Sequence, residues 1–493
     1  MDYDVIIIGA GLGGLVCGAL LAQKGLRVVI FEKRSKVGGC CTSFTRKGFT
    51  FDLSVQSIGG WRQGERVRRL LDGMGLGEAI EFIPLDPARE YYFPDLKVYQ
   101  YTDLSSHIEY LSSFFPQESE GINEVYQIYH SISEEIDRFP HTLSWFEPTR
   151  FAREFPFTFQ YREKTLLELL NGVIKDPRLK VILGVRSSYA LLPPSRLSVI
   201  AMASLEMSYL KGGVAVLKGR MEALPQLVAE GFKRCGGMVQ TRQEVTEIMV
   251  EGNEAVGVRL KNKETITSKV IVSNADATST FLEMIGDEYL PSSWTKRLKG
   301  MKPSFSYFII YLGVNGELDL SCSNNEIFPG YDLEEEYRYL EEGKIAPSTP
   351  YYCLAPSLLN PSHAPQGYST LCLSYKAPYR LSGAWNRDVR RAIAERIIAQ
   401  AEAIVPNLRQ RIVTEASSTP LTIERMTGNR WGAAYGWAQI PRQAGIYRLS
   451  RVSPIDRLYM TGHWTAPGGG VAAVMASGQI TADMIWERIK GKE

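Results

Sequence analysis

The sequence predicts an α/β fold, and two observations support this. Near the amino terminus, an apolar segment rich in β-branched residues (3–8) is followed by four glycines, a segment with helical periodicity, and a second apolar strand at 26–31. Further strand-like segments recur at 238–249, 269–275 and 457–462, and a helical segment begins near residue 471. With 493 residues, 44% of them hydrophobic, the chain can bury a large core.

Composition argues against several functional classes. The 56 basic and 54 acidic residues give a net charge of +2, whereas a dedicated nucleic-acid-binding protein usually carries a strong basic excess. The seven cysteines are odd in number and contain no CxxC pair, and none of the five histidines lies at a metal-like spacing from another. We therefore expect a reducing, cytoplasmic environment, no nucleic acid and no metal.

The apolar segment 5–22 is long enough to be mistaken for a membrane helix. However, Asp2 and Asp4 precede it where a signal sequence would place lysine or arginine, and five glycines interrupt it. We interpret the segment as a buried strand and a helix joined by a glycine turn.

The glycines between the strand and the helix have the spacing GxGxxG. Gly9 permits a tight turn, Gly11 lets the backbone approach a pyrophosphate, and Gly14 allows the helix to pack closely on the strand. The amino terminus of the helix offers amide donors to phosphates. Glu32, 18 residues after Gly14, ends the second strand, where a carboxylate can accept hydrogen bonds from a ribose. This unit predicts a dinucleotide site that disfavours a 2′-phosphate.

The residues after Glu32 narrow the choice of dinucleotide. Lys33 and Arg34, the pair Gly38-Gly39, and residues 48–52 (GFTFD) resemble the extended FAD signature of a flavin-dependent superfamily. That superfamily contains amine oxidases, phytoene desaturases, carotenoid isomerases and retinol saturases. Two positions depart from its pattern: Cys40 follows the paired glycines, and Ser54 replaces a glycine. We interpret Cys40 as a small residue packed near the cofactor rather than a reactive thiol.

The resemblance continues in the middle and at the end of the chain. Residues 269–276 (KVIVSNAD) match the desaturase and isomerase branch, and residues 467–471 (PGGGV) match its carboxyl-terminal glycine turn. His463 stands where the family often has aspartate; we favour a polar lining residue over a proton donor or acceptor. The resemblance implies these FAD-binding residues: Gly9, Gly11, Leu12, Gly13, Gly14, Glu32, Lys33, Arg34, Gly38, Gly39, Cys40, Val245, Asn274, Ala275, Gly462, His463, Gly470, Val471 and Ala472.

The resemblance also implies a domain organisation. We expect a discontinuous, Rossmann-like FAD-binding domain made of residues 1–89, 211–299 and 441–493. Residues 90–210 and 300–440 would form an inserted α+β substrate domain on a mixed sheet. Within it, residues 386–404 form an amphipathic helix that we expect to pack on that sheet.

Residues 139–162 form an aromatic-rich segment with Arg150 and Arg153. Two interpretations stay open: an ordinary loop and helix packed on the domain, or a peripheral membrane contact in which aromatics enter the interface and arginines meet anionic head groups.

For function, the resemblance implies an FAD-dependent oxidoreductase acting on carbon–carbon double bonds of a lipophilic polyene or isoprenoid, as a desaturase, isomerase or saturase. Such chemistry requires neither a triad nor a metal. Trp431, Tyr435 and Trp437 either line a polyene tunnel or pack beneath the flavin. The alternatives are a flavin amine oxidase, which would carry Gly-Glu-His-Thr where this chain has TGHWT (461–465), and a binding protein without turnover. The sequence identifies no catalytic acid or base.

Overall fold

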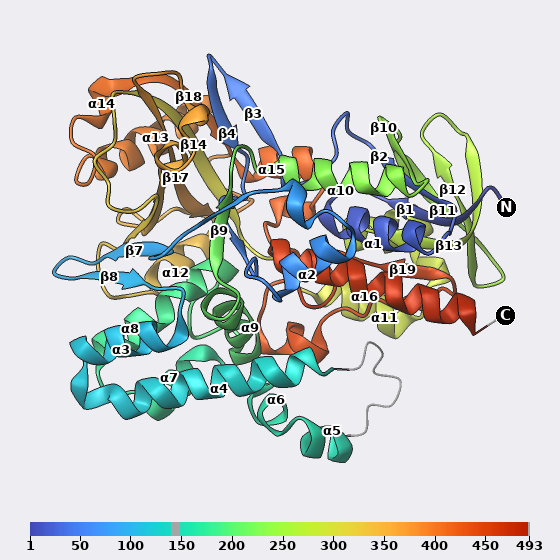
Figure 1. Ribbon diagram of the computed structural model, residues 1–493, viewed down its shortest axis with the longest axis horizontal. Coiled ribbons are helices and arrows are strands. Elements are labelled where there is room, and N and C mark those ends of the chain that lie inside the picture. Colours follow the sequence, from blue (N-terminus) through green and yellow to red (C-terminus); the bar gives the residue numbers. More distant parts are fainter. Residues whose placement is uncertain (140–147, 492–493) are drawn as a thin grey trace.

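The computed structural model describes residues 1–139 and 148–491 (Figure 1). Two large sheets organise these residues, each with seven strands. The first lies near both chain termini and the second at the opposite end of the molecule (Figure 1). The arrangement confirms the predicted α/β class, with one mainly parallel sheet and one mixed sheet.

The first sheet has the order β10-β2-β1-β13-β12-β11, and β19 also pairs with β13. Strands β10, β2, β1, β13 and β19 run parallel, whereas β11, β12 and β13 form an antiparallel meander. The strand bounds are β1 Tyr3–Ile8, β2 Val28–Glu32, β10 Met238–Thr241, β11 Val245–Glu251, β12 Glu254–Leu260, β13 Thr265–Ser273 and β19 Leu458–Met460. The strands predicted near residues 3–8, 26–31, 238–249, 269–275 and 457–462 are confirmed.

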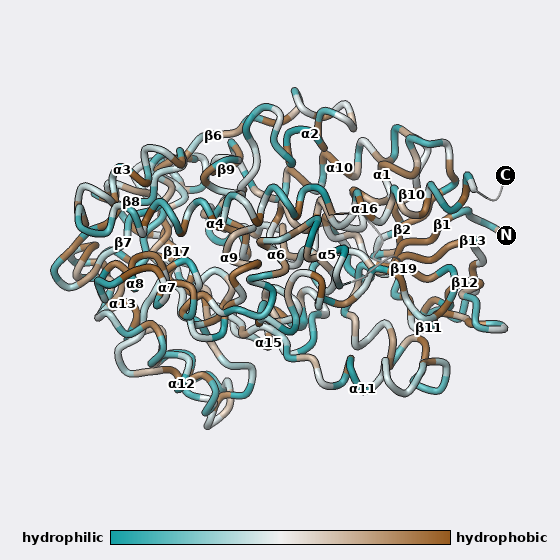
Figure 2. The backbone as a smooth tube through the Cα atoms, turned by 90° about the horizontal axis from the view of Figure 1, so that it is seen from below, coloured by the Kyte–Doolittle hydropathy of each residue, from teal (hydrophilic) through white to brown (hydrophobic). Residues whose placement is uncertain are grey.

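Both faces of this sheet are buried, as the alternating side chains of β1 show. Val5 and Ile7 pack against helices α1, α10 and α16, whereas Ile6 and Ile8 pack on the opposite side. Figure 2 shows these strands as hydrophobic segments. A parallel strand covered on both faces is apolar throughout, as residues 5–8 are. The helices around this sheet are α1 Leu12–Gln23, α2 Arg66–Gly73, α10 Ala223–Arg234, α11 Ser292–Gly300 and α16 Val471–Lys490. The segment 5–22 is thus a strand and a helix, as predicted.

The second sheet has the order β18-β14-β17-β16-β15-β7-β8, and only its β15–β7 pair is parallel. Its strands are β7 Arg89–Tyr92, β8 Lys97–Gln100, β14 Ser306–Asn315, β15 Asn324–Ile327, β16 Tyr351–Leu354, β17 Tyr368–Ala377 and β18 Ile412–Ser418. Helix α13 (Arg387–Ala401) buries Ile393 and Ile397 against β14 and β17. The prediction of a packing helix over 386–404 is confirmed.

Smaller elements connect the two sheets. The hairpin of β3 (Ser43–Arg46) and β4 (Phe49–Asp52) places Phe49 and Phe51 against Tyr311 of the second sheet. A three-stranded sheet contains β5 (Ile58–Gly59), β6 (Phe82–Pro84) and β9 (Val214–Leu217). The proposed domain bounds stay a prediction, but the strands of the two large sheets come from interleaved parts of the chain.

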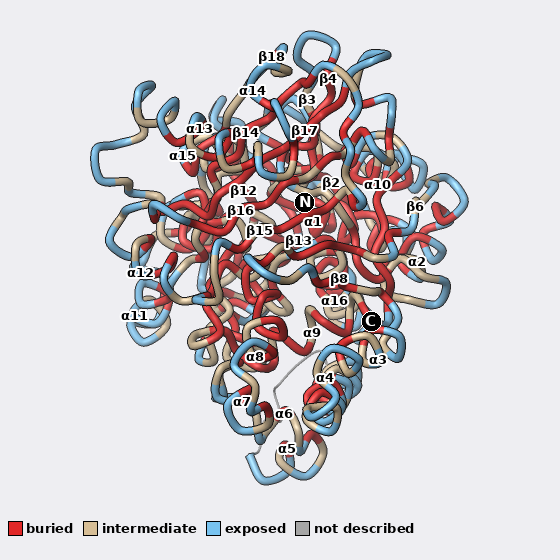
Figure 3. Tube along the Cα trace, turned by 90° about the vertical axis from the view of Figure 1, so that its left-hand side faces the viewer, coloured by how far each residue is buried: buried red, intermediate tan, exposed pale blue. Residues whose placement is uncertain are grey.

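Most of the remaining helices cover the lower part of the molecule in Figure 1, whereas α14 lies beside the second sheet and α15 lies between the two large sheets. Figure 3 shows that their outward surfaces are exposed while the strands between the layers are buried. These helices are α3 Leu104–Phe114, α4 Ser119–Asp137, α5 Pro148–Glu154, α6 Pro156–Tyr161, α7 Leu166–Val173, α8 Pro177–Gly184, α9 Val199–Leu210, α12 Glu335–Glu341, α14 Leu408–Arg411 and α15 Pro420–Thr427. Within the described part of the chain, every helix is too short or too polar to cross a bilayer.

Candidate functional site

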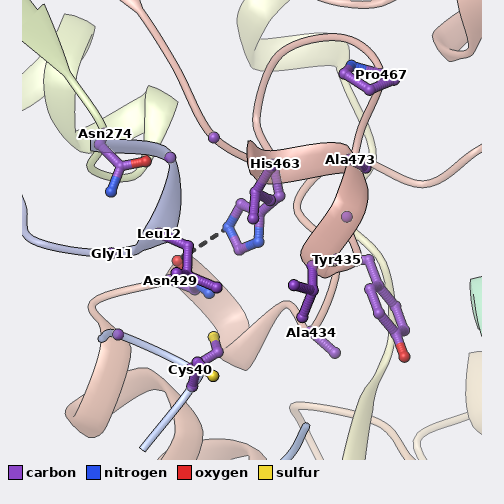
Figure 4. Close-up of a pocket in the computed structure, with 18 of the residues that line it drawn as sticks. Gly11, Leu12, Cys40, Asn274, Asn429, Ala434, Tyr435, His463, Pro467 and Ala473 are labelled. Carbon is purple, nitrogen blue, oxygen red and sulfur yellow. Dashed lines mark hydrogen bonds between the residues drawn. The ribbon is translucent and has the colours of Figure 1, made fainter. Parts of the chain in front are cut away.

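A cavity of about 1730 Å³ extends from the carboxyl ends of β1, β2 and β13 to the inner face of the second sheet. One end is lined by the glycine turn before α1, and the other by side chains of β14, β16, β17 and α9. Figure 4 shows the middle of this region, where residues from distant parts of the sequence converge. In open α/β sheets, ligands bind at this edge.

The glycine turn opens the first end of the cavity. Gly9 has a φ of +95°, which favours glycine, and a Cβ on Gly14 would lie only 2.4 Å from the Gly9 carbonyl oxygen. The turn and α1 therefore pack too closely for a side chain at Gly14. Leu12 and Gly13, the first residues of α1, line the cavity, so the amino terminus of the helix faces it with its amide donors and partial positive charge.

Glu32 is fixed beside this turn. One carboxylate oxygen accepts a hydrogen bond from the Ala10 amide and the other from the Arg34 amide, both at 2.9 Å. Glu32 is buried and lines the cavity. A carboxylate oxygen can accept more than one hydrogen bond, so a hydroxyl-bearing ligand can still bind to this oriented group.

Asn274 joins the glycine turn to the end of β13. Its backbone amide donates to the Ile8 carbonyl at 2.8 Å, and its Nδ2 donates to the Gly9 carbonyl at 3.3 Å. A Cβ on Gly462 would lie 2.4 Å from Asn274 Oδ1. The asparagine therefore fills the space between two glycine turns, in addition to lining the cavity.

Arg448, which the sequence did not identify, fixes the wall of the cavity formed by residues 435–443 and 462–467. Its guanidinium lies beneath this wall and is buried. Among the described residues it donates to five backbone carbonyls, those of Tyr435 (3.3 Å), Trp437 (3.1 Å), Gln443 (3.5 Å), His463 (2.6 Å) and Thr465 (3.0 Å). Burial lowers the pKa of Arg448 to about 9. A single arginine in a loop carries no sequence pattern that would have revealed this role.

His463 is held neutral within that wall. Its Nε2 lies 3.2 Å from Asn429 Oδ1 (Figure 4). Since Asn429 Nδ2 donates to the Ala433 carbonyl at 3.1 Å, Oδ1 is the atom that faces the histidine, and Nε2 carries the proton. Burial, assisted by the charge of Arg448, lowers the pKa of His463 to about 3. This favours the interpretation of His463 as a neutral polar lining residue.

Cys40 and Ser54, the two departures from the FAD signature, lie together. Ser54 Oγ donates to the Cys40 carbonyl at 2.9 Å, and both residues line the cavity. Burial raises the pKa of the Cys40 thiol to about 11, so it stays a thiol near neutral pH. Cys40 therefore acts as a small lining side chain.

The far end of the cavity follows the two-residue period of the second sheet. Tyr307 and Ile309 of β14 face the cavity, whereas Phe308 and Ile310 pack under α13. Further side chains facing the cavity are Tyr352 and Leu354 of β16, Cys372 and Ser374 of β17, and Ala201, Ser204, Leu205 and Ser208 of α9.

The three aromatic residues suggested for a polyene tunnel are divided among different environments. Tyr435 lines the cavity. Trp437 is buried in the core with its ring centroid 4.8 Å from that of Trp464, and Trp431 is 37% exposed at the surface. Of these three aromatic residues, Tyr435 is therefore the one that can contact a ligand in the cavity.

Nearly all of the predicted FAD-binding residues line this one cavity; the exception is Gly14, whose position is set by packing against Gly9. Their contact with a cofactor stays a prediction. Among the described residues, no group of histidine, cysteine, aspartate and glutamate side chains is arranged to hold a metal.

Comparisons with known proteins give the same picture. A family model described as "Flavin containing amine oxidoreductase" matches residues 12–485. The chain is 27% identical to a chloroplastic prolycopene isomerase of Daucus carota, covering 98% of this chain and 80% of the relative. It is 26% identical to a lycopene-forming phytoene desaturase of a Paracoccus species, covering 97% and 96%. It is also 25% identical to an all-trans-retinol 13,14-reductase of Danio rerio, covering 94% and 82%.

Solved structures share the fold. Cyclohexylamine oxidase from Brevibacterium oxydans superposes with a TM-score of 0.66 at 14% identity, covering 99% of this chain and all of its own. Putrescine oxidase bound to putrescine gives a TM-score of 0.66 at 15% identity, covering 99% of each chain. At this identity the likeness establishes the architecture alone.

The buried, neutral His463 predicts a specific pH dependence of stability. The pKa of His463 is about 3 in the folded protein, compared with an ordinary value of 6.5 for a histidine in the unfolded chain. As the pH falls below about 6.5, the unfolded chain therefore binds this proton while the folded protein does not. The free energy of unfolding should then decrease by about 1.4 kcal/mol for each pH unit until the pH approaches 3. In His463→Asn this contribution disappears.

Urea unfolding of the two proteins at pH 7 and pH 5 measures the difference. We expect the loss on acidification to be about 2 kcal/mol smaller in His463→Asn. The exposed His130, changed to asparagine, serves as the control and should leave the slope unaltered. If the free energy of unfolding falls equally between pH 7 and pH 5 in the wild type and in His463→Asn, His463 takes up its proton in the folded state as well.

Proposed function

The chain belongs to the family of flavin-containing amine oxidoreductases, and we propose that it is an FAD-dependent oxidoreductase acting on carbon–carbon bonds of a hydrophobic polyene or isoprenoid. The observation that carries the substrate class is its similarity, along almost the whole chain, to relatives named for carotenoids and retinol. The cavity supports it, because one continuous space joins the nucleotide end to an extended wall of the second sheet.

The described residues fit FAD. We assign the pyrophosphate to the Gly9–Gly14 turn and the amino terminus of α1, and the adenosine ribose to Glu32. We assign the adenine to the end of the cavity that Val245 lines, and the flavin to the turn around Gly462 and Gly470. The crowding of Asn274 against Gly11 and Gly13 leaves these positions without side chains, so the backbone is open to a bulky anion.

When bound, FAD supplies the hydride acceptor or donor that carbon–carbon oxidation and reduction require. The protein's contribution is to position and to exclude water. The amino terminus of α16 ends at the cavity and stabilises negative charge there. The proton on His463 Nε2 is held by Asn429, so this ring presents a neutral surface. Leu205 and Ile309 provide apolar contacts for a hydrocarbon chain.

An anaerobic assay separates the polyene oxidoreductase from the amine oxidase alternative. Purified flavoprotein is mixed with phytoene, a cis-carotenoid or retinol, with oxidised and with reduced flavin, while flavin absorbance and product spectra are recorded. Benzylamine and putrescine provide the parallel amine series. We expect a new or isomerised polyene in at least one redox state, and no bleaching by amines. Bleaching by amines with no change in any polyene would contradict the proposal.

We further propose that the enzyme associates peripherally with membranes, because a lipophilic substrate is delivered from lipid. Phe151 and Phe155 are buried and contact each other at a 5.2 Å centroid distance, so they do not form the contact surface. We assign the contact to Trp145 and Phe146, which lie outside the described residues. Arginines of the same segment, such as Arg153, would meet anionic head groups.

Flotation with vesicles of phosphatidylcholine and phosphatidylglycerol tests this attachment. We expect the double variant Trp145→Ser, Phe146→Ser to bind about tenfold more weakly than wild type, because aromatic side chains anchor proteins at the interface. Leu421→Ser, at an exposed position elsewhere, is the matched control. Unchanged flotation of the double variant would exclude this segment as the anchor.

A further inference from the structure

A cluster of buried cations lies at the substrate end of the cavity. Arg89 begins β7, Arg186 precedes α9, and Lys376 lies near the end of β17. All three side chains are at most 5% exposed. A polyene hydrocarbon offers no partner for such groups, so their presence beside an apolar tunnel requires an explanation.

Two of the three cations have close partners within the protein. Arg186 Nε lies 3.1 Å from Glu206, and its Nη1 donates to Gln100 Oε1 at 2.6 Å. Lys376 donates to Glu336 at 2.7 Å. Their charges are therefore paired and hydrogen-bonded, as buried charges usually are.

Arg89 differs from them because it lines the cavity. Its nearest carboxylate partner, Glu326, lies 3.5 Å from Nη1, and the buried Nε and Nη1 donate no hydrogen bond to any residue that the structure describes. Arg186 Nε and Nη2 also donate none among these residues, but Arg186 does not line the cavity. Burial raises the pKa of Glu326, while the charges of Lys376 and Arg89 oppose that shift. The Arg89 side chain lines the cavity, so a ligand can reach it there, whereas Nε and Nη1 are themselves covered by protein atoms.

Tyrosine rings hold the Arg89 guanidinium in place. Its Cζ lies 4.6 Å from the ring centroid of Tyr189 and 5.3 Å from that of Tyr352. Arg186 lies against Tyr189 as well, at 4.7 Å. Ring contacts of this kind position a guanidinium while leaving its N–H groups for an acceptor, and the planar fork matches a carboxylate.

We propose that Arg89 and the rings of Tyr189 and Tyr352 form a site for the terminal carboxylate of an amphipathic polyene. The proposal deepens the proposed function, on which it rests, by giving the substrate an ionised end and an apolar chain. Arg186 and Lys376 lie closer to their carboxylate partners than Arg89 lies to Glu326, and of these three cations Arg89 is the one that lines the cavity. That suits a monoanion rather than a diphosphate.

Binding of matched ligands tests the site without requiring turnover. The probes are retinoic acid and a C30 polyene monocarboxylic acid, each with its methyl ester, together with geranylgeranyl diphosphate. Quenching of tryptophan fluorescence and shifts of the flavin spectrum report binding to the holoprotein. We expect each acid that binds to do so about tenfold or more tightly than its ester, since charge-assisted hydrogen bonds are lost in the ester.

Variants assign that preference to Arg89. Arg89→Met should bind acid and ester within about threefold of each other, and Arg89→Lys should keep part of the preference. Arg69→Met removes an exposed arginine that also lines the cavity and should behave as wild type. Binding of the ester and a normal flavin content show that Arg89→Met is folded. If Arg89→Met does not fold, the preference of Arg89→Lys for the acid over the ester is used instead.

Several outcomes would overturn the site: equal binding of acid and ester by the wild type, an unchanged preference in Arg89→Met, or tighter, Arg89-dependent binding of the diphosphate. Failure of the proposed function has a different signature. In that case no polyene would change or exchange electrons with the flavin, while the Arg89-dependent preference for acids would persist and support the site.

Discussion

The side chain of Arg448 donates hydrogen bonds to five carbonyl oxygens from two chain segments, 435–443 and 462–467. These segments line the part of the cavity to which we assign the flavin, and they contain no regular strand or helix longer than one turn. Irregular backbone leaves many polar groups without partners, and a buried guanidinium with five N–H donors satisfies several at once. The shape of this wall therefore depends on one cation that has no carboxylate partner among the described residues.

That cation also sets the electrostatics of the wall. Its charge adds to burial in keeping His463 neutral, and a neutral histidine lets Asn429 occupy a fixed orientation. The amino termini of α1 and α16 reach the same cavity from two directions. A ligand with a long anionic and aromatic body would meet these fixed dipoles and the oriented carboxylate of Glu32. The second sheet contributes the wall of the cavity to which we assign the substrate.

The sequence predicted the parts whose determinants are local. The strand, glycine turn and helix at residues 3–23 depend on residues adjacent in the chain, and so does the placement of Glu32 at the end of β2. Arg448 and Arg89 could not be predicted, because their roles arise only when remote segments meet. The same holds for Trp431 and Trp437. They share an aromatic segment with Tyr435, yet the backbone bends so that Trp431, at a φ of +57°, faces the solvent and Trp437 enters the core.

Arg448 holds together the wall of the cavity to which we assign the flavin, and the flavin content of Arg448→Met measures this role. Methionine fills similar volume but leaves the carbonyls without donors, at a cost of roughly 1–3 kcal/mol for each group that water cannot reach. Because of this cost, we expect purified Arg448→Met to bind less than about a tenth of an equivalent of FAD. Its far-ultraviolet circular dichroism should stay that of the wild type. A variant that retains one equivalent of tightly bound flavin would contradict the account.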